Sequence, residues 1–452
     1  MPGHPQPIHG PSPGGGRRGN PMASATTIVN ARVFDGTQLQ EWTSVRFVDG
    51  LITECSVDSA AQAGDEVVDA AGWTLLPGLI DSHVHLVPGA LEQSLTFGVT
   101  TVLDMFSKPE LVARAKEQSR SRSDLADVWS SGIGATSPDG HPSAMYAPFP
   151  TLTGAHQAEQ FVAERIEEGS DYLKVISGTG GLWPSLDSET INALTAAAHA
   201  RGLLVVAHVS STAGVEQVVA AGVDVLAHVP ADAELESALV ARIAGAGIAV
   251  GPTLATIENT LGEAGGAAVA ADPRLAEFLG EAWAHRLNSG APSLGGRAMP
   301  PYSRAEGNVR LLAAAGVTLL AGTDAPNPGT VFGASLHREL ELLVRCGLNP
   351  AQALAAATSE PARVFGLSDR GRVAAGLRAD LVLVSGDPLQ DITATRSIER
   401  IWRGGTACER GAFVASAAEA EQLDAFDAQV AKVVAAVRER RSGFRPGRTA
   451  KS

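Results

Sequence analysis

Six residues of types that can bind metal ions follow short apolar stretches of this chain. Two lie in PGLIDSHVHL and the others in DYLKVIS, VVAHV, VLAHV and LLAGTD; they are His83, His85, Lys174, His208, His228 and Asp324. Neutral imidazole and carboxylate are good ligands for Zn²⁺ and similar divalent ions. A polar side chain in apolar surroundings is costly unless it is satisfied. One such histidine is as easily a hydrogen-bonded core residue, but six residues together favour a shared metal site.

The lysine of this set, Lys174, needs its own chemistry. A protonated amine beside two cations is strongly disfavoured, so we expect a lowered pKa for Lys174. A neutral amine can react with carbon dioxide to give a carbamate, an anionic ligand whose two oxygens can bridge two metal ions. The alternative is a lysine in an ion pair with a nearby carboxylate. Its position among the histidines favours the role of metal ligand.

The stretches before these residues belong to a regular alternation of apolar strands and Ala-rich helices. Eight strands are expected, in GLIDSHVHL, VTTVLDMF, DVWSSGI, YLKVIS, LLVVAHV, VDVLAHV, GIAVGPT and VTLLAGTD. Near-continuous apolar strands alternating with helices indicate a parallel sheet covered on both sides. Eight such units predict an α/β fold of the (β/α)8 TIM-barrel type, in which chemistry lies at the carboxyl ends of the strands. The six residues occupy those ends.

The two ends of the chain predict a second, smaller domain. TTIVNARVFDG and TSVRFVDGLITECS near the start, and RADLVLVSGDPL and IERIWRGGTACERGAFV near the end, are typical of strands. We expect them to pair into one small β-sandwich around the inserted barrel. The predicted division is a disordered tail at 1–24, β-sandwich at 25–76 and 367–416, barrel at 77–366, and a C-terminal helix and tail at 417–452. Within the barrel, residues 254–305 are expected to form a lid over its mouth.

The composition restricts the class of protein. The 452 residues are 44% hydrophobic and 19% charged, with a formal net charge of -14. Nucleic-acid surfaces concentrate Lys and Arg, and only GGGRRGN and the C-terminal RERRSGFRPGRTAKS do so here. We therefore expect a small-molecule substrate and no nucleic-acid partner, and a homo-oligomer is expected.

The start of the chain and its cysteines bear on location. The first 24 residues are rich in Pro and Gly and lack the apolar core of a secretory signal, and Met22 is a candidate natural start. No apolar run is long enough to span a bilayer, so a cytoplasmic protein without membrane contact is expected. Three cysteines far apart, Cys55, Cys346 and Cys408, are expected to be buried free thiols.

The motifs PGLIDSHVHL, YLKVISGTGG, VVAHVSS, VLAHVP and LLAGTDAP occur in an order and spacing that resemble a known family. The chain is similar to the amidohydrolase superfamily from about residue 26 to residue 415. It is most similar to the group of imidazolonepropionase-like proteins and Xaa-Pro dipeptidases. LHRELELLVRCGLNPAQALAAATSEPARVFGL, followed by GRVAAGLRADLVLVSGDPL, also resembles the end of such chains.

The resemblance implies a binuclear metal centre, with zinc as the expected metal. His83, His85 and Asp324 would hold one ion, and His208 and His228 the other. Carboxylated Lys174 and a hydroxide would bridge them. The implied activity is hydrolysis of a C–N bond in an amide-like substrate by attack of that hydroxide. Asp324 would take the proton of the hydroxide and pass it to the leaving nitrogen.

Other residues are weaker candidates for the site. His141, in GATSPDGHPSAMY, matches a loop histidine of the resembled group and is expected to bind substrate or polarise its carbonyl, with an exposed loop histidine as the alternative. Tyr146 could line the pocket. Trp283 and Tyr302 of the lid could do so or could pack internally. His337 could face the pocket rim, with a helix cap or solvent exposure as the alternatives. Three further histidines are expected on helix surfaces; they are His156, His199 and His285.

The sequence does not identify a single substrate class. The resembled group acts on dipeptides, acyl amino acids and xenobiotic amides, ureas and carbamates, and no residue near AHVPAD suggests capture of a peptide carboxylate. Three alternatives are a lactone or organophosphate esterase on the same site, a mononuclear deaminase, and a non-catalytic binding protein. Lys174 argues against the deaminase, and the complete ligand set argues against the binding protein.

Overall fold

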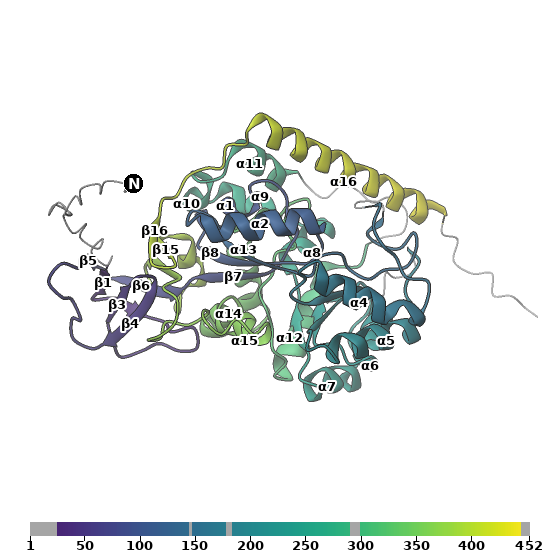
Figure 1. Ribbon diagram of the computed structural model, residues 1–452, viewed down its shortest axis with the longest axis horizontal. Coiled ribbons are helices and arrows are strands. Elements are labelled where there is room, and N and C mark those ends of the chain that lie inside the picture. The colour runs from purple at the N-terminus through teal and green to yellow at the C-terminus, as the bar shows by residue number, and fades with distance from the viewer. Residues whose placement is uncertain (1–24, 144–146, 178–182, 290–298, 444–452) are drawn as a thin grey trace, which may run out of the picture.

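The strands of this α/β protein form two kinds of sheet, which differ in strand direction and in the parts of the chain that build them (Figure 1). The computed structural model describes residues 25–143, 147–177, 183–289 and 299–443. One group consists of small, mainly antiparallel sheets built from residues near both ends of the chain. The other consists of parallel sheets flanked by helices. The predicted tail at 1–24, including Met22, lies outside the described residues.

Two small sheets bring the chain ends together. The first has the order β4-β3-β1-β5, with strands Leu51–Ser56, Ser44–Val48, Ala25–Val29 and Glu66–Asp69. The second has the order β16-β15-β14-β6-β2, with strands Thr406–Cys408, Ile398–Arg403, Leu381–Ser385, Trp73–Pro77 and Arg32–Val33. Its centre is the antiparallel pairing of β14 with β6, in which Leu381 lies opposite Pro77. Residues more than 300 positions apart thus share one sheet.

Two parallel sheets carry the candidate site. One contains β7 (Leu79–Val84), β8 (Val99–Asp104) and β9 (Asp127–Ser130). The other contains β10 (Leu173–Ile176), β11 (Val205–His208), β12 (Val225–Ala227) and β13 (Ala249–Gly251). Within each of these two sheets, every strand pairs with the next in chain order, and all the pairs are parallel. Seven of the eight expected strands are therefore present as strands.

The eighth expected strand, in VTLLAGTD, is not a regular strand. It forms isolated parallel bridges, at Leu319 with Val250 and at Ala325 with Val84. A third bridge, between Ala135 and Val175, links the two sheets on the other side. Within this segment the Ala321 N–H donates to the Ala356 carbonyl oxygen and not to a neighbouring strand, and Asp324 at its end has φ 56°, in the left-handed region.

Helices follow most of the parallel strands and cover the sheets (Figure 1). After the first six strands these are α1 (Ala90–Thr96), α2 (Pro109–Ser121), α4 (Ala158–Glu167), α5 (Ser188–His199), α6 (Thr212–Ala220) and α7 (Ser237–Gly245). Residues after β13 form α8 (Leu254–Thr260), α9 (Gly265–Ala271), α10 (Pro273–Ala276), α11 (Glu281–Asn288) and α12 (Tyr302–Ala314). The last helices are α13 (Ala334–Arg345), α14 (Pro350–Ala356), α15 (Ser359–Val364) and α16 (Ala417–Gly443). Side-chain caps begin some of them: the Asp187 carboxylate accepts the Thr190 N–H at α5.

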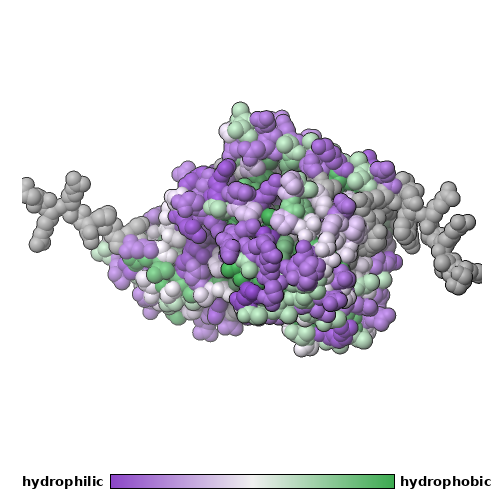
Figure 2. Space-filling view, turned by 45° about the vertical axis from the view of Figure 1, so that its right-hand side comes forward, coloured by the Kyte–Doolittle hydropathy of each residue, from purple (hydrophilic) through white to green (hydrophobic). Residues whose placement is uncertain are grey.

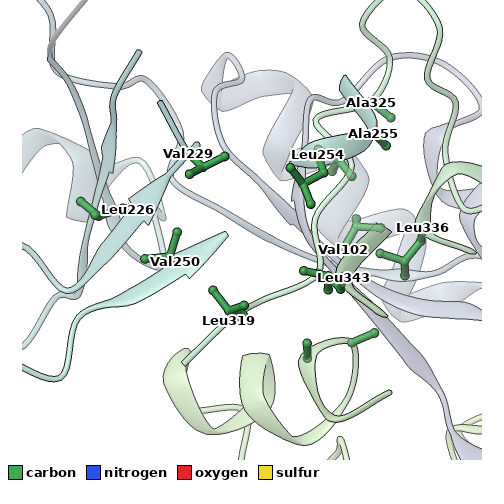
Figure 3. Packing of buried hydrophobic residues seen from close by; sticks show 14 of the residues in the cluster. Val102, Leu226, Val229, Val250, Leu254, Ala255, Leu319, Ala325, Leu336 and Leu343 are labelled. Carbon is green, nitrogen blue, oxygen red and sulfur yellow. The ribbon is translucent and has the colours of Figure 1, made fainter. Parts of the chain in front are cut away.

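The core between strands and helices is largely aliphatic, as the composition predicts. Figure 3 shows part of it, including Val250 and Leu319 from neighbouring parallel segments and Leu336 and Leu343 from α13. Burial of such side chains stabilises the fold by roughly 1.5–3 kcal/mol each. The aromatic Trp283 belongs to this core, because it is 1% exposed and meets Phe332 edge-on at 5.4 Å.

The surface on the side shown in Figure 2 is mostly hydrophilic, with small hydrophobic patches between. Within the described residues, no helix is both long and apolar enough to cross a membrane. Of the three cysteines, Cys346 is buried and the other two are partly buried, and all are free thiols. The prediction of helix-surface histidines is confirmed, since each is exposed; they are His156, His199 and His285.

The prediction for His337 is wrong. Its side chain is buried, with 1% of the residue exposed. Nδ1 lies 3.0 Å from the Thr395 hydroxyl, and Nε2 lies 3.1 Å from the Phe97 carbonyl oxygen. Both ring nitrogens are satisfied by residues distant in the sequence, so this histidine joins α13 to its neighbours and does not face the pocket rim or solvent.

Candidate functional site

The parallel strands bring the six predicted residues to one end of their sheets. His83 is the second-to-last residue of β7, and His85 directly follows that strand. His208 ends β11, and His228 follows β12. Lys174 lies within β10, and Asp324 follows the bridge-forming segment at Leu319. Parallel neighbours end on the same side of a sheet, so a short run of backbone at each carboxyl end places its polar side chain in the common site.

Asp324 joins the two histidines of the HVH motif. Its Oδ1 lies 3.3 Å from Nε2 of His83 and 3.0 Å from Nε2 of His85. Ligand atoms bound to one tetrahedral zinc at about 2.0–2.1 Å lie about 3.3 Å from each other. Each of these two distances is compatible with a pair of ligands to a common ion.

His208 and His228 form a second pair beside the first. Nε2 of His228 lies 3.1 Å from Nδ1 of His208, and Nδ1 of His228 lies 3.9 Å from Oδ2 of Asp324. The rings of His83 and His228 are 4.8 Å apart between centroids. One ligand atom from each of His83, His228 and Asp324 lies within 4.8 Å of the others. The two pairs thus adjoin and share Asp324 between them.

Lys174 lies beside this cluster with an unsatisfied amine. The residue is 2% exposed, and Nζ has no hydrogen-bond partner among the described residues. A Cβ placed on Gly134 would lie 3.3 Å from Cγ of Lys174, so the side chain runs close over that glycine. Burial lowers the pKa of Lys174 to about 7, although Asp324 and Asp104 oppose the shift. An ion pair, the alternative role for Lys174, is not formed within the described part of the chain.

The histidines of the site favour the neutral form that binds metals. Burial lowers the pKa of His83 and of His208 well below the usual value, and neighbouring cationic groups act in the same direction. Burial lowers the pKa of His228 to about 4 even though Asp324 opposes it. For Asp324 burial works to raise the pKa, but His228, His85 and Lys174 outweigh it, so its pKa is below the usual value. Asp324 thus lies among imidazoles of which His83, His208 and His228 favour the neutral form, a donor set that fits Zn²⁺ and similar ions.

Two buried carboxylates that were not predicted support the histidines from behind. Asp81 accepts hydrogen bonds from the His83 N–H at 3.1 Å, the Thr323 N–H at 3.0 Å and the Thr323 hydroxyl at 2.7 Å. It thereby ties the HVH motif to the segment that carries Asp324. Asp104 accepts from the Leu86 N–H at 3.1 Å, directly after His85. Both carboxylates stand in apolar strands of the sequence, which was a signal that could have identified them.

His141 lies at the edge of the ligand cluster. Its ring centroid is 5.0 Å from that of His208 and 6.4 Å from that of Trp183. It is partly buried, and burial lowers its pKa to about 4. A neutral imidazole here can donate one hydrogen bond to a substrate oxygen. Tyr146, the other predicted contact, lies outside the described residues. Trp283 and Tyr302 are buried in packing, at 1% and 6% exposed.

The model of the Amidohydrolase family matches residues 74–408, which include all six candidate ligands. The chain therefore belongs to the Amidohydrolase family. It is a hydrolase of the superfamily that acts on amide-like C–N bonds.

Individual proteins agree with that assignment. An uncharacterized protein of Mycobacterium tuberculosis (strain ATCC 25618 / H37Rv) is 28% identical over 376 residues, which cover 79% of this chain and 88% of that protein. An imidazolonepropionase of Salinispora arenicola is 26% identical over 400 residues, covering 79% and 89%. The crystal structure of a putative prolidase from Bifidobacterium longum has a TM-score of 0.68 and 24% identity, covering 90% of this chain and 100% of that one. The predicted likeness to imidazolonepropionases and Xaa-Pro dipeptidases is confirmed.

Proposed function

We propose that the protein hydrolyses an amide-like C–N bond with a binuclear metal centre. His83, His85 and Asp324 hold one ion, and His208 and His228 hold the other. The observation that carries the proposal is the convergence of these side chains at ligand spacing, 3.0 to 3.3 Å around Asp324 and 3.1 Å between the second pair of histidines. The buried amine of Lys174 beside them supplies the remaining ligand.

Lys174 becomes that ligand by reaction with carbon dioxide. The lone pair of neutral Nζ attacks the carbon of carbon dioxide, so that an N–C bond forms while one C=O π bond opens onto oxygen, and the nitrogen loses one proton to solvent water. The product is a carbamate with two oxygens, which can bridge two ions. The pKa of about 7 supports this step, because much of the amine is already neutral near pH 7. The absence of a hydrogen-bond partner for Nζ among the described residues also supports it.

The chain's own residues supply the proton transfers and the substrate contact. Two divalent ions held by these residues would supply a water of lowered pKa and a polarised substrate carbonyl. Asp324 accepts the proton of the attacking water and passes it to the leaving nitrogen, since its second oxygen faces the site. His141 donates a hydrogen bond to the carbonyl oxygen as negative charge develops there.

The proposed architecture that positions these groups is a (β/α)8 barrel within a small β-sandwich. Three isolated bridges support closure, because they connect the segment after β9 to β10, β13 to the eighth segment, and that segment to β7. The pairing of β6 with β14 supports a sandwich at 25–76 and 367–416 around a barrel at 77–366, with the C-terminal helix outside. We propose further that the protein acts on a small molecule as a cytoplasmic homo-oligomer without nucleic acid, in line with its net charge of -14.

The substrate classes that fit are amides, ureas and carbamates, with dipeptides and acyl amino acids as the related biological forms. The experiment is a screen of the metal-loaded protein against representatives of each class, together with lactones and organophosphate esters. Metal content is measured on the same sample by elemental analysis. About two ions per chain with turnover of a C–N substrate supports the proposal.

Other outcomes of the same screen would favour one of the three alternative functions. Turnover of esters alone, with two ions bound, identifies the esterase alternative. One ion per chain, unmodified Lys174 and release of ammonia identify a mononuclear deaminase. Absence of metal and of turnover in every class leaves a binding protein. Native mass spectrometry of the intact folded chain adds an independent check, since the carbamate adds about 44 Da, the mass of one carbon dioxide.

A further inference from the structure

A threonine from the loop after β13 orients the ring of His228. The Thr253 hydroxyl lies 2.6 Å from Nδ1 of His228, and the same hydroxyl donates to the Pro252 carbonyl oxygen at 2.8 Å. A hydroxyl carries a single proton, so with that proton on Pro252 it accepts from His228. Nδ1 therefore carries the hydrogen, and the lone pair lies on Nε2. That nitrogen faces Nδ1 of His208 at 3.1 Å.

Thr253 holds this position in a conformation that its residue type disfavours. Its φ is 53° and its ψ is 45°, in the left-handed region. A β-branched residue there is a genuine outlier, and such strain persists only where the surroundings hold it. Thr253 is fully buried. A contact outside the loop must therefore stabilise the backbone at this position.

Glu339 on α13 provides that contact. Its Oε1 accepts from the Leu254 N–H at 3.0 Å, and its Oε2 accepts from the Ala255 N–H at 2.7 Å. These are the first two backbone donors of α8, directly after Thr253. Glu339 is 0% exposed, and among the described residues it forms no ion pair. Burial raises the pKa of Glu339 to about 8, although the two N–H groups oppose the shift, and both of its oxygens are used to hold this one turn.

We infer that Glu339 is a positioning residue for the second metal ion, acting through Thr253 on His228. This inference rests on the proposed binuclear centre and adds Thr253 and Glu339 to it, and Glu339 reaches the Leu254 N–H across 85 positions of the chain. Glu339 fixes the backbone after Thr253, Thr253 fixes the tautomer and tilt of His228, and Nε2 is thereby presented beside His208. Partners of this kind behind a metal ligand contribute roughly 10–100-fold to metal affinity.

The first test compares metal affinity in the wild type and in Glu339→Gln, by competition with a chelator for Zn²⁺. Gln has one oxygen where Glu has two, so one of the two N–H groups loses its acceptor. We expect the second ion, held by His208 and His228, to bind at least about 10-fold less tightly than in the wild type. The matched control is Glu258→Gln, because Glu258 also joins α8 to α13, through Arg338 at 2.6 Å. We expect the control to lower thermal stability without changing metal affinity.

A second pair of variants keeps the test valid if Glu339→Gln fails to fold. Thr253→Val removes the hydroxyl and keeps the shape, whereas Thr253→Ser keeps the hydroxyl. We expect Thr253→Val to weaken the second ion and Thr253→Ser to restore its affinity. In the metal-free protein labelled with ¹⁵N-histidine, the Nδ1–H signal of His228 is expected in the wild type and in Thr253→Ser, and is expected to be lost in Thr253→Val.

The outcomes separate this inference from the proposed function. Wild-type affinity in both Glu339→Gln and Thr253→Val overturns the positioning role while leaving two ions in place. Equal weakening by Glu258→Gln also overturns it, since any loosening of α8 would then have the same effect. A wild type that binds fewer than two ions overturns the binuclear centre, and the ¹⁵N signal of His228 then decides the positioning role without metal.

Discussion

Gly322 lies directly against His83. A Cβ placed on Gly322 would be 2.9 Å from the Cβ of His83 and 3.0 Å from its backbone nitrogen. The nearest atom to that Cβ is Oγ of Ser82 at 2.8 Å, but the two His83 atoms are backbone or the root of a side chain and cannot rotate away. The glycine in AGTD is thus required by the approach of the eighth segment to the metal-binding motif.

Gly322→Ala is therefore expected to displace His83. We expect kcat/KM to fall more than about 10-fold and the free energy of unfolding to fall by about 1–3 kcal/mol, the usual cost of overpacking. Steady-state kinetics, metal content and urea unfolding measure the three effects. The control is Gly307→Ala in α12, where a new Cβ meets nothing within 4 Å. It is expected to leave activity unchanged and to stabilise by up to about 1 kcal/mol. Full metal content and activity in Gly322→Ala would contradict the argument.

Lys174→Ala tests the lysine as a metal ligand. Removing the buried amine is expected to lower the metal content from two ions to one or fewer, and to lower activity by more than about 100-fold. A short carboxylate such as formate or acetate fits the space left and is expected to restore part of the activity in proportion to its concentration. Lys116→Ala removes a lysine that pairs with Asp171 at 2.6 Å, and it serves as the control with unchanged metal content. Full activity of Lys174→Ala without added carboxylate would exclude the bridging role.

Much of the candidate site could be predicted because its residues carry local signals. His83 and His85 interrupt an apolar strand, as do His208, His228 and Asp324, and a buried polar residue in such a run is unusual enough to attract notice. The alternation of strands and helices then predicts that parallel strands bring them together, which the pairings of β7 through β13 confirm.

The supporting contacts could not be predicted, because each depends on two distant segments. No local sequence signal distinguishes Thr253 from another threonine at a helix start. Its contact with His228 forms only because β12 and β13 lie side by side. Glu339 looks like one of several charged residues of ASLHRELELL, yet it is 0% exposed. His337, two positions earlier, was misjudged for the same reason. The irregular eighth segment also involves a tertiary contact, from the Ala321 N–H to the Ala356 carbonyl oxygen, which the strand-like composition of VTLLAGTD does not indicate.

Acid is expected to destabilise the metal-free protein. Burial lowers the pKa of His228 to about 4 and that of His337 to about 3, against about 6.5 in an unfolded chain. Between these values the unfolded chain binds protons that the folded chain does not. The stability these groups contribute is thus fully present above pH 6.5 and is lost as the pH falls toward 4. Each histidine contributes a slope of up to about 1.4 kcal/mol per pH unit.

Urea unfolding at several pH values between 7 and 4 measures that slope. Bound metal holds His228 neutral and competes with the proton, so the metal-loaded protein is expected to lose stability at a lower pH. His337 lies away from the ligands, so His337→Asn is expected to reduce the slope of both forms. Equal stability of the metal-free protein at pH 7 and pH 5 would show that these histidines are not buried in the neutral form.

Asp127 joins the parallel sheet to the small sheets. Its carboxylate at the start of β9 accepts from Arg370 at 2.7 Å and also from Arg378 and Arg403. Burial works to raise its pKa, but the three guanidinium groups outweigh it and lower the pKa to about 2. Asp127→Asn leaves three partly buried cations without their shared anion, a change of the kind that costs about 3–5 kcal/mol.

Chemical unfolding of Asp127→Asn is expected to show this loss, with metal content and kcat unchanged. The separation of effects follows from position, because Asp127 begins its strand while the ligands lie at the carboxyl ends of theirs. The matched control is Asp124→Asn, which breaks an exposed ion pair with Arg122 at 2.8 Å and is expected to cost less than about 1 kcal/mol. A loss of metal in Asp127→Asn at temperatures where it remains folded would mean that the small sheets influence the metal site directly, and the two parts of the chain could not then be treated as independent.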